Sequence, residues 1–428
     1  MREQAKEIAV EVLSRLRTPP HIQRIASTSA TRLEASGLWD ASSYATGFAG
    51  LAVAQLVLSD VDPAAADVAS QHMRTAIEQV GGRSTISVIA GFGSLAAAAV
   101  VASGCASSYA ALATRGCDWL AVECDQVCSE QHARWRAGET WADERMWDAA
   151  CGLGGAGRVL VAAHQQGVGD YATTLRSICS VLVRLTEPAT GPDGVRVPGW
   201  WIRPGTQTRC INGGWNPGLA HGISGPLVTL AALWRAGITV PGHRDAISRI
   251  AAALTEARTD DYRWPHTVPL TSAHDSNSVH ARSAWCYGAA GIARALYLAG
   301  ASIGDHEIVD EGCTVFRAIA EQDVESWNLW GPTFCHGYAG MLQIVDRTAI
   351  ETGDAVLADQ AARLAAIIIA SYRDGNEFGF AHVHDRSGPT IVAGDFPGVL
   401  TGAAGTALSL MSWARPETPA WDLPLLMT

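Results

Sequence analysis

Residues 336–345 read HGYAGMLQIV, in which two glycines three positions apart open an apolar run. The same pattern, a glycine, two residues, a second glycine and a run rich in Ala, Leu and Val, recurs along the chain. Its first glycine stands at seven places: Gly47, Gly91, Gly152, Gly222, Gly288, Gly337 and Gly402. In the unit that begins at Gly91, Ser94 replaces the second glycine, so the pattern accepts another small residue.

The intervals between these units leave room for two helices and a connection in each repeat. Glycine permits a tight entry turn, and the nearly uncharged run after it suits a helix buried on most sides. Amphipathic stretches between the units, such as residues 306–322, suit outer helices. We therefore expect an all-α fold, an α/α toroid with seven inner helices ringed by seven outer helices. It would form a single domain over residues 1–428, with residues 1–40 as an N-terminal helical lead-in. The alternative is an ordinary α-solenoid whose glycines serve packing alone.

Composition narrows the class of protein. Hydrophobic residues make up 48% of the chain and charged residues 17%, which indicates a compact globular protein. The net charge of -11 and the lack of a basic run argue against a nucleic-acid partner. The charged N-terminus lacks the apolar core of a signal peptide, and polar residues interrupt the longest apolar stretches. Ten cysteines without an export signal predict reduced thiols in the cytoplasm.

Reactive side chains stand one to six residues before the first glycine of four consecutive units. In a toroid the same end of every inner helix faces a common cavity, so these side chains are expected to converge. They are Asp148 before Gly152, His221 before Gly222, Arg282 and Cys286 before Gly288, and Cys335 and His336 before Gly337.

Two of these cysteines predict a metal site. Cys286 and Cys335 each lie two residues before the first glycine of adjacent units, and His336 follows Cys335. Two cysteines and one histidine with an open fourth position form a ligand set of catalytic zinc. We expect one Zn²⁺ per chain, whose task is to keep an incoming thiolate nucleophilic. The alternative is a pair of small buried thiols that fill space near the glycines.

Three motifs carry a resemblance to a known family. RSAWCYG from Arg282, CHGYAG from Cys335 and GLAHGISGP from Gly218 resemble the hallmark motifs of the lanthipeptide cyclase (LanC) family. The resemblance covers nearly the whole chain and is to the free-standing class I type. It implies the α/α toroid and an enzyme that adds cysteine thiols of a precursor peptide to dehydroalanine or dehydrobutyrine. Lanthionine or methyllanthionine thioether rings would result.

The resemblance also implies roles for individual residues. Zinc is the family's cofactor, and its ligands match Cys286, Cys335 and His336. The other active-site positions match His221, Asp148 and Arg282. His221 suits a general acid because its ordinary pKa lies near neutral pH, and Asp148 suits its orientation. Arg282 keeps its charge and suits stabilisation of an enolate.

The expected partners are the dehydrated precursor peptide, a cognate dehydratase and an export transporter. The protein is expected in the cytoplasm, where its partner proteins would associate it with the membrane. Three other functions remain open. A glycan-processing toroid would need paired carboxylates, and a zinc thiol transferase would add a small thiol such as glutathione. A helical scaffold that binds peptides without chemistry would hold zinc in a closed, four-ligand site.

Several further groups are left outside the expected site. Cys124 and Cys128 with His132 lack further ligands, and loop histidines more often face solvent. The Trp-rich connection over residues 198–218 is expected to be a packed loop. The loop histidines are His274 and His280 before Arg282, and His382 and His384 before the last unit.

Overall fold

The computed structural model describes residues 1–140, 142–191, 194–203, 213–269, 282–385 and 391–428. In these residues the structure is mostly helical, with two short antiparallel hairpins and isolated β-bridges. One hairpin pairs β1 (Pro188–Thr190) with β2 (Arg196–Pro198), and the other pairs β3 (His382–Asp385) with β4 (Val392–Gly394). The chain divides into two compact units. That residues 1–428 form a single domain stays a prediction.

A long helix begins at or just after the first glycine of every predicted unit. These inner helices are mostly apolar, and every residue of α3 is buried. They are α3 (Phe48–Leu58), α5 (Gly91–Cys105), α7 (Leu153–Gln165), α9 (Ser224–Arg235), α11 (Ala289–Ile303), α13 (Tyr338–Thr352) and α15 (Ala403–Ala414).

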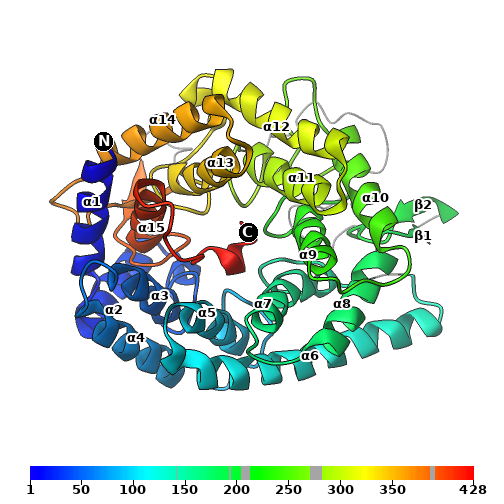
Figure 1. The fold of residues 1–428 in the computed structure, drawn as a ribbon, viewed down its shortest axis with the longest axis horizontal. Coiled ribbons are helices and arrows are strands. Elements are labelled where there is room, and N and C mark those ends of the chain that lie inside the picture. The colour runs from blue at the N-terminus through cyan, green and yellow to red at the C-terminus, as the bar shows by residue number, and fades with distance from the viewer. Residues whose placement is uncertain (141, 192–193, 204–212, 270–281, 386–390) are drawn as a thin grey trace. The chain divides into compact units, whose positions relative to one another are not determined.

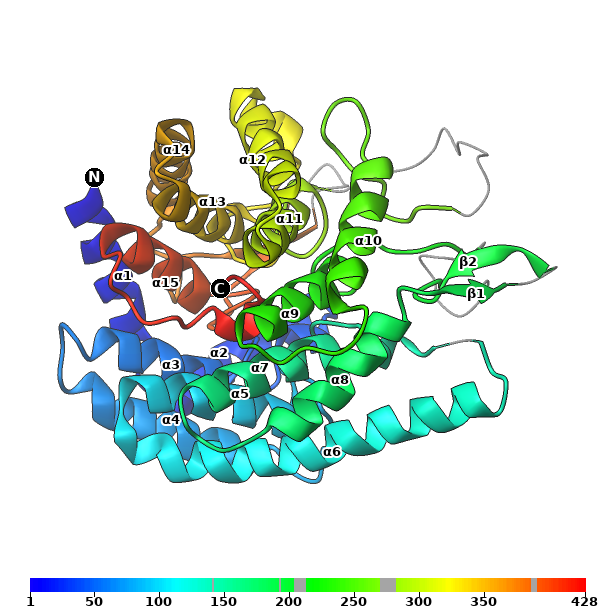
Figure 2. The same ribbon diagram turned by 45° about the vertical axis from the view of Figure 1, so that its right-hand side comes forward.

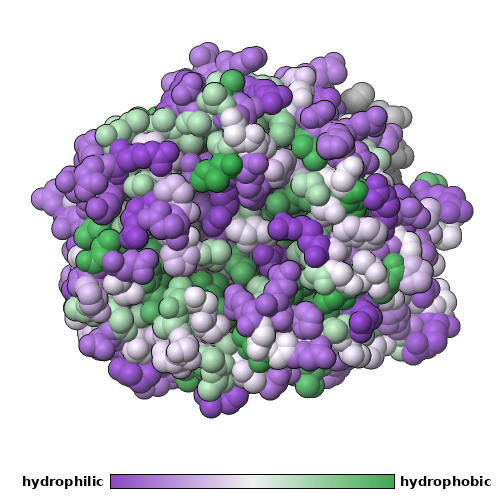
Figure 3. All heavy atoms as spheres, viewed as in Figure 1, coloured by the Kyte–Doolittle hydropathy of each residue, from purple (hydrophilic) through white to green (hydrophobic). Residues whose placement is uncertain are grey.

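Amphipathic helices alternate with the inner ones. In α12, for example, the buried face consists of Gly312, Cys313, Val315, Phe316 and Ile319. Hydrophilic residues cover much of the outer surface (Figure 3). The amphipathic helices are α1 (Arg2–Arg15), α2 (Pro19–Arg32), α4 (Ala65–Gln79), α6 (Ala110–Arg136), α8 (Ala172–Arg184), α10 (His243–Glu256), α12 (His306–Glu321) and α14 (Ala355–Ser371). Within the described ranges, no helix combines the length and apolar character that crossing a bilayer requires.

The first unit consists mainly of residues 1–116 and 322–423. Its inner helices pack in the order α13, α15, α3, α5 (Figure 1). Outer helix α14 packs on α13, α1 on α15 and α4 on α3. Helices α1 and α2 lie in the predicted lead-in, and α1 supplies the outer partner of α15 although the two are at opposite ends of the chain.

The second unit consists mainly of residues 117–321. Inner helices α7, α9 and α11 pack in sequence, with α8, α10 and α12 as their outer partners. The β1–β2 hairpin follows α8 and extends away from the helices of this unit (Figure 2). Residues near the C-terminus also belong here, because Trp285 Nε1 donates to the carbonyl of Leu425 (2.9 Å) and Arg158 Nε to that of Thr428 (2.9 Å).

The turns before the inner helices are hydrogen-bonded to one another in a repeated register. Each bond joins residues that lie two positions before the first glycine of neighbouring repeats. In the second unit, Ala150 N–H donates to Ala220 O (3.3 Å), and Ala220 N–H donates to Cys286 O (3.2 Å). In the first unit, Cys335 N–H donates to Leu400 O (2.8 Å), and Leu400 N–H donates to Ala45 O (2.8 Å). Cys286 and Cys335 therefore occupy the same position of the repeat, each within its own unit.

Ser94, the one departure from the glycine pair, has a structural role. Its side chain is fully buried, and its Oγ accepts a hydrogen bond from the backbone N–H of Tyr44 (2.6 Å). A second glycine here would leave that buried N–H without this partner. The small polar residue thus ties the turn before α3 to the start of α5.

Candidate active site

Asp148 and His221 form the clearest polar pair of the second unit. Asp148 lies in the turn before α7, and His221 in the turn before α9. His221 Nδ1 lies 2.7 Å from Asp148 Oδ2. The other carboxylate oxygen, Oδ1, accepts the backbone N–H groups of Ala150 and Cys151, both at 2.6 Å. Three hydrogen bonds therefore fix the carboxylate, and the carboxylate fixes the imidazole.

The two partners differ in exposure. The Asp148 side chain is 7% exposed, whereas that of His221 is 40% exposed. A hydrogen bond at Nδ1 orients the ring so that Nε2 points away from the carboxylate. Of the two side chains, the imidazole is therefore the one that another molecule can reach, and the orienting role expected of Asp148 stays a prediction.

Opposing effects set the pKa of His221. Burial lowers the pKa. The hydrogen bond that the imidazole donates to Asp148 and the negative charges of Asp148, Cys286 and Glu144 raise it, and the net result is a pKa above the ordinary 6.5. A raised pKa keeps a larger share of the imidazole protonated at neutral pH. This favours a histidine that gives up a proton during a reaction.

Tyr287 lies beside His221, and His266 lies beside Tyr287; neither was predicted from the sequence. The Tyr287 ring stacks on His266 with centroids 4.3 Å apart, and it lies 6.0 Å from the His221 ring. A signal for Tyr287 was present in the sequence, because it directly precedes Gly288 just as His221 directly precedes Gly222. His266 carries no such signal, since it lies in a connection between repeats.

The segment from Arg282 to Gly288 is held closely against α11. Gly288 has a φ of 112°, and a Cβ atom there would lie 1.2 Å from the carbonyl oxygen of Arg282. Only glycine fits such a position. Arg282 is half-buried, and Cys286 is buried with its carbonyl accepting from Ala220. In the second unit the fold thus places Asp148, His221, Arg282 and Cys286 in successive turns before inner helices.

Cys335 and His336 lie in the turn before α13 of the first unit, and both are half-buried. The His336 ring contacts Trp330 and His382 edge-to-face, with centroid distances of 6.2 and 5.2 Å. His382, which lies in β3, is buried, and its Nδ1 is 3.0 Å from Thr333 Oγ1. Burial and the nearby imidazoles of His336 and His384 lower the pKa of His382 to about 3, so it is neutral at physiological pH.

The side chains predicted to bind zinc are chemically suited to it. Cys286, Cys335 and His336 offer two thiols and one imidazole, a set of donors that could hold a metal ion. Zinc prefers sulfur and nitrogen ligands of this kind. The donor chemistry therefore fits the cofactor that the motifs imply.

A cavity of about 580 Å³ lies in the second unit. It reaches Asp148 and Cys151, and the indoles of Trp147 and Trp201 form part of its wall. Trp201 belongs to the Trp-rich connection, whose described part is packed as expected, since Trp200 and Trp201 are both buried. The cavity thus connects that packed segment to the carboxylate that holds His221.

The remaining candidates have other surroundings. Cys124 and Cys128 are buried in α6, where burial raises the pKa of both thiols, that of Cys128 to about 12. Both therefore stay protonated thiols, as expected of core cysteines. His274, His280 and the central part of the Trp-rich connection lie outside the described residues.

Comparison with known proteins identifies the fold and the family. The sequence model described as "Lanthionine synthetase C-like protein" matches residues 39–426. Among solved structures, "Nisin cyclase" superposes with a TM-score of 0.72 at 16% sequence identity, over 96% of this chain and 98% of that chain. No curated protein sequence matches the chain. The structural likeness confirms the predicted fold class, an all-α α/α toroid.

Proposed function

Because the chain belongs to the lanthionine synthetase C-like family, we propose that it is a zinc-dependent lanthipeptide cyclase. It adds cysteine thiols of a dehydrated precursor peptide to dehydroalanine or dehydrobutyrine, forming lanthionine or methyllanthionine rings. The observation that carries this proposal is the His221–Asp148 pair, an exposed imidazole held by a buried carboxylate in a chain of this family.

Cys286, Cys335 and His336 are the proposed ligands of one Zn²⁺ per chain. Their two thiols and one imidazole support this assignment. When bound, the metal would lower the pKa of a substrate thiol so that it reacts as a thiolate near neutral pH.

The proposed reaction is a Michael-type addition within the peptide. The substrate sulfur forms a bond to the β-carbon of the dehydro residue, and the π electrons of the double bond move onto the carbonyl oxygen as an enolate. The α-carbon then takes a proton, which restores the carbonyl and completes the thioether. The thiol has lost one proton and the α-carbon has gained one, so the ring has the mass of the open peptide.

His221 is the proposed source of the proton that reaches the α-carbon. Asp148 holds the ring through Nδ1, which leaves Nε2 for the substrate, and the raised pKa of His221 keeps that proton available at neutral pH. Arg282 is the proposed electrostatic partner of the enolate oxygen, because a guanidinium stays charged and can donate two parallel hydrogen bonds.

The substrate chemistry implies partners. Dehydro residues arise by removal of water from Ser or Thr, so a dehydratase must act on the peptide first. The proposed partners are therefore the dehydrated precursor, its dehydratase and an export transporter.

The proposal is tested with a dehydrated, cysteine-containing peptide. After incubation, remaining thiols are alkylated and the products are analysed by mass spectrometry. A closed ring takes no alkylating group, so the wild-type protein should yield unmodified mass. Glutathione is added in a second reaction, in which an adduct without rings would favour the thiol-transferase alternative. If the peptide remains fully alkylated in both reactions, the protein has neither activity, and the binding-scaffold alternative is the one that remains.

Variants assign the roles. Replacing Cys335 by Ala should abolish both zinc content and ring formation, whereas His221→Asn should keep zinc and lower the cyclisation rate about 10²–10⁴-fold, the usual contribution of a proton donor. Cys313→Ala is the matched control, since this buried thiol of α12 belongs to the outer layer. A Cys335→Ala protein with full zinc content would contradict the ligand assignment.

A further inference from the structure

His382 is a buried imidazole that has no role in the proposed reaction. Loop histidines were expected to face solvent, but this one lies in β3 of the first unit and is 1% exposed. Its Nδ1 lies within hydrogen-bond distance of Thr333 Oγ1, at 3.0 Å, and the Thr333 side chain is fully buried as well. A polar ring is stable in such surroundings because a partner replaces the water that it has lost. The pair therefore joins β3 to the turn that carries Cys335 and His336.

Several contacts fix the plane of the His382 ring. The hydrogen bond at Nδ1 is one of them. Two others are edge-to-face contacts, with His336 at a centroid distance of 5.2 Å and an interplanar angle of 67°, and with Phe396 at 6.0 Å and 83°. Aromatic pairs favour such distances and angles. Since Phe396 is fully buried too, His382 contacts His336 from a rigid position.

Strand β3 lies directly against the turn before α13. The turn is closed by a hydrogen bond in which Trp330 N–H donates to His336 O (3.0 Å). A Cβ atom at Gly331 would lie only 2.6 Å from Cγ2 of Val383, so the strand and the turn are in close contact. The backbone of His336 is thus held beside the strand that carries His382.

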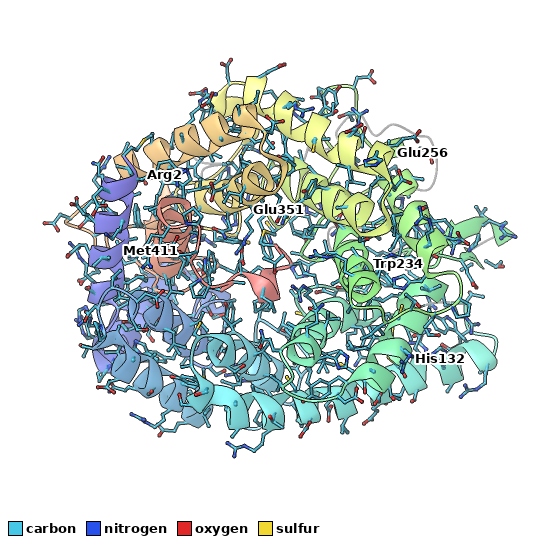
Figure 4. The ribbon with its side chains drawn as sticks, viewed as in Figure 1. Arg2, His132, Trp234, Glu256, Glu351 and Met411 are labelled. Atoms are coloured by element: carbon cyan, nitrogen blue, oxygen red, sulfur yellow. The ribbon has the colours of Figure 1, made fainter. Side chains whose placement is uncertain are left out.

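Helix α15 also supports this turn. Figure 4 labels Met411 on this helix and Glu351 near the end of α13, and the two helices pack side by side. In the first turn of α15, Thr406 Oγ1 donates a hydrogen bond to Pro332 O (3.2 Å). Contacts with both β3 and α15 therefore hold the turn that carries His336.

The His336 side chain, by contrast, is oriented by ring contacts. Within the described ranges its ring nitrogens form no hydrogen bond, and its ring contacts are with Trp330 and His382. In most metal sites a hydrogen bond at the second nitrogen of a ligating histidine fixes the ring. Trp330 is half-buried, whereas His382 is buried and hydrogen-bonded. His382 is therefore the better fixed of the two neighbours.

We propose that His382 is a positioning residue for the zinc ligand His336, and that it holds this imidazole in the orientation in which it binds the metal. Thr333 completes the arrangement, because its hydroxyl fixes the rotation of the His382 ring. This rests on the part of the proposed function that makes His336 a ligand. A ring that is already oriented loses less conformational freedom when the metal binds, so the site binds zinc more tightly.

The zinc affinity of the full-length protein measures this contribution directly. Each protein is titrated with zinc in competition with a chromophoric chelator of known affinity. His382→Leu removes the ring and its bond to Thr333, and it should weaken zinc binding about 10–100-fold, the usual effect of losing a residue that orients a ligand. His384→Leu is the matched control, since it removes an exposed imidazole from the same strand, and its zinc affinity should equal that of the wild type.

Thr333 provides a test that leaves the His382 ring in place. Thr333→Val keeps the shape of the side chain but removes the hydroxyl, so it should weaken zinc binding about two- to tenfold, in line with the loss of one hydrogen bond. Thr333→Ser keeps the hydroxyl and should bind zinc as the wild type does. If His382→Leu does not fold, these two variants decide the question, and wild-type affinity in Thr333→Val would overturn the inference.

Cobalt separates positioning from stability. Co²⁺ replaces Zn²⁺ in sites of this kind, and its visible absorption spectrum depends on the geometry of the ligands. The spectrum should change in cobalt-loaded His382→Leu and Thr333→Val and stay that of the wild type in Thr333→Ser and His384→Leu. A merely structural role predicts a lower melting temperature of the metal-free variants with unchanged zinc affinity and cobalt spectrum, and that result would overturn the inference.

The outcome is separable from that of the proposed function. If Cys335→Ala loses zinc but His382→Leu binds it as tightly as the wild type, the ligand assignment stands and the positioning role is refuted. If zinc binding depends on both Cys335 and His382 in a protein that closes no rings, the positioning role stands and the cyclase is refuted. Full zinc content in Cys335→Ala would refute the ligand assignment and the positioning role together.

Discussion

At the scale of single residues, the His221–Asp148 pair leads to a prediction about the pKa of His221 and the pH dependence of cyclisation. Replacing Asp148 by Asn removes the main influences that raise the pKa of His221, while burial, which lowers it, remains. We expect the pKa of His221 in Asp148→Asn to fall below its wild-type value, measured by NMR titration of the imidazole. The decline of cyclisation at high pH should begin at a lower pH, because the protonated form is the donor. An unchanged His221 pKa would contradict this account.

The same pair contributes stability that depends on pH. A pKa raised in the folded state means that folding tightens proton binding, so the contribution is full below the ordinary His pKa of about 6.5 and disappears as pH rises through the raised value. The difference in free energy of unfolding between wild type and Asp148→Asn should therefore be larger at pH 6 than at pH 9. Asp359→Asn, an exposed residue on α14, is the control.

The buried hydrogen bond of Ser94 leads to a prediction about stability. Ser94→Ala leaves the buried N–H of Tyr44 without its acceptor, which typically costs about 1–3 kcal/mol. Urea denaturation should show this loss in the free energy of unfolding. Ser177→Ala serves as the control, because that hydroxyl is half-buried on α8 and donates to the carbonyl of Thr173 in its own helix, at 3.4 Å. Equal stabilities of the two variants would mean that water or backbone adjustment replaces the Ser94 bond.

At the scale of a secondary-structure element, the glycines at the two ends of α11 differ in how much space a larger side chain would have. Gly288 precedes the helix with a φ of 112° and Gly304 ends it with a φ of 67°, but only Gly288 faces another atom, the carbonyl oxygen of Arg282. Gly304→Ala should cost about 1–2 kcal/mol for the left-handed backbone alone. Gly288→Ala adds a steric clash and should exceed about 4 kcal/mol or prevent folding. Urea denaturation compares them, and similar losses would show that the turn relaxes.

At the scale of the whole molecule, metal removal should lower stability. A ligand that binds only the folded state stabilises it according to its concentration and affinity, so chelation should lower the melting temperature of the zinc-loaded protein. Differential scanning calorimetry with and without a chelator measures the shift, and metal analysis gives the expected one zinc per chain. Cys335→Ala should melt at the same temperature with and without chelator. A chelator effect that persists in this variant would place the metal elsewhere.

The sequence could predict the inner helices because their signals are local. A glycine pair followed by an uncharged run specifies both an entry turn and a buried helix within about a dozen residues, as in the stretch from His336. Repetition then set the register, so Asp148, His221, Cys286 and Cys335 could be named as candidates by their distance from a glycine. Arg282 was named in the same way, six residues before Gly288, and the family motifs added its role.

Other features required the tertiary structure because their parts are distant in sequence. Pairing of α1 with α15 joins opposite ends of the chain, and the contact of His382 with His336 depends on how β3 packs. The cavity takes Arg134 from the end of α6, Trp147 from a turn and Arg203 from a connection. None of these has a fixed offset from a glycine. The repeat determined which side chains stand before the inner helices. The packing between repeats decided which other residues surround those side chains, because contacts depend on distance in space and not on position along the chain.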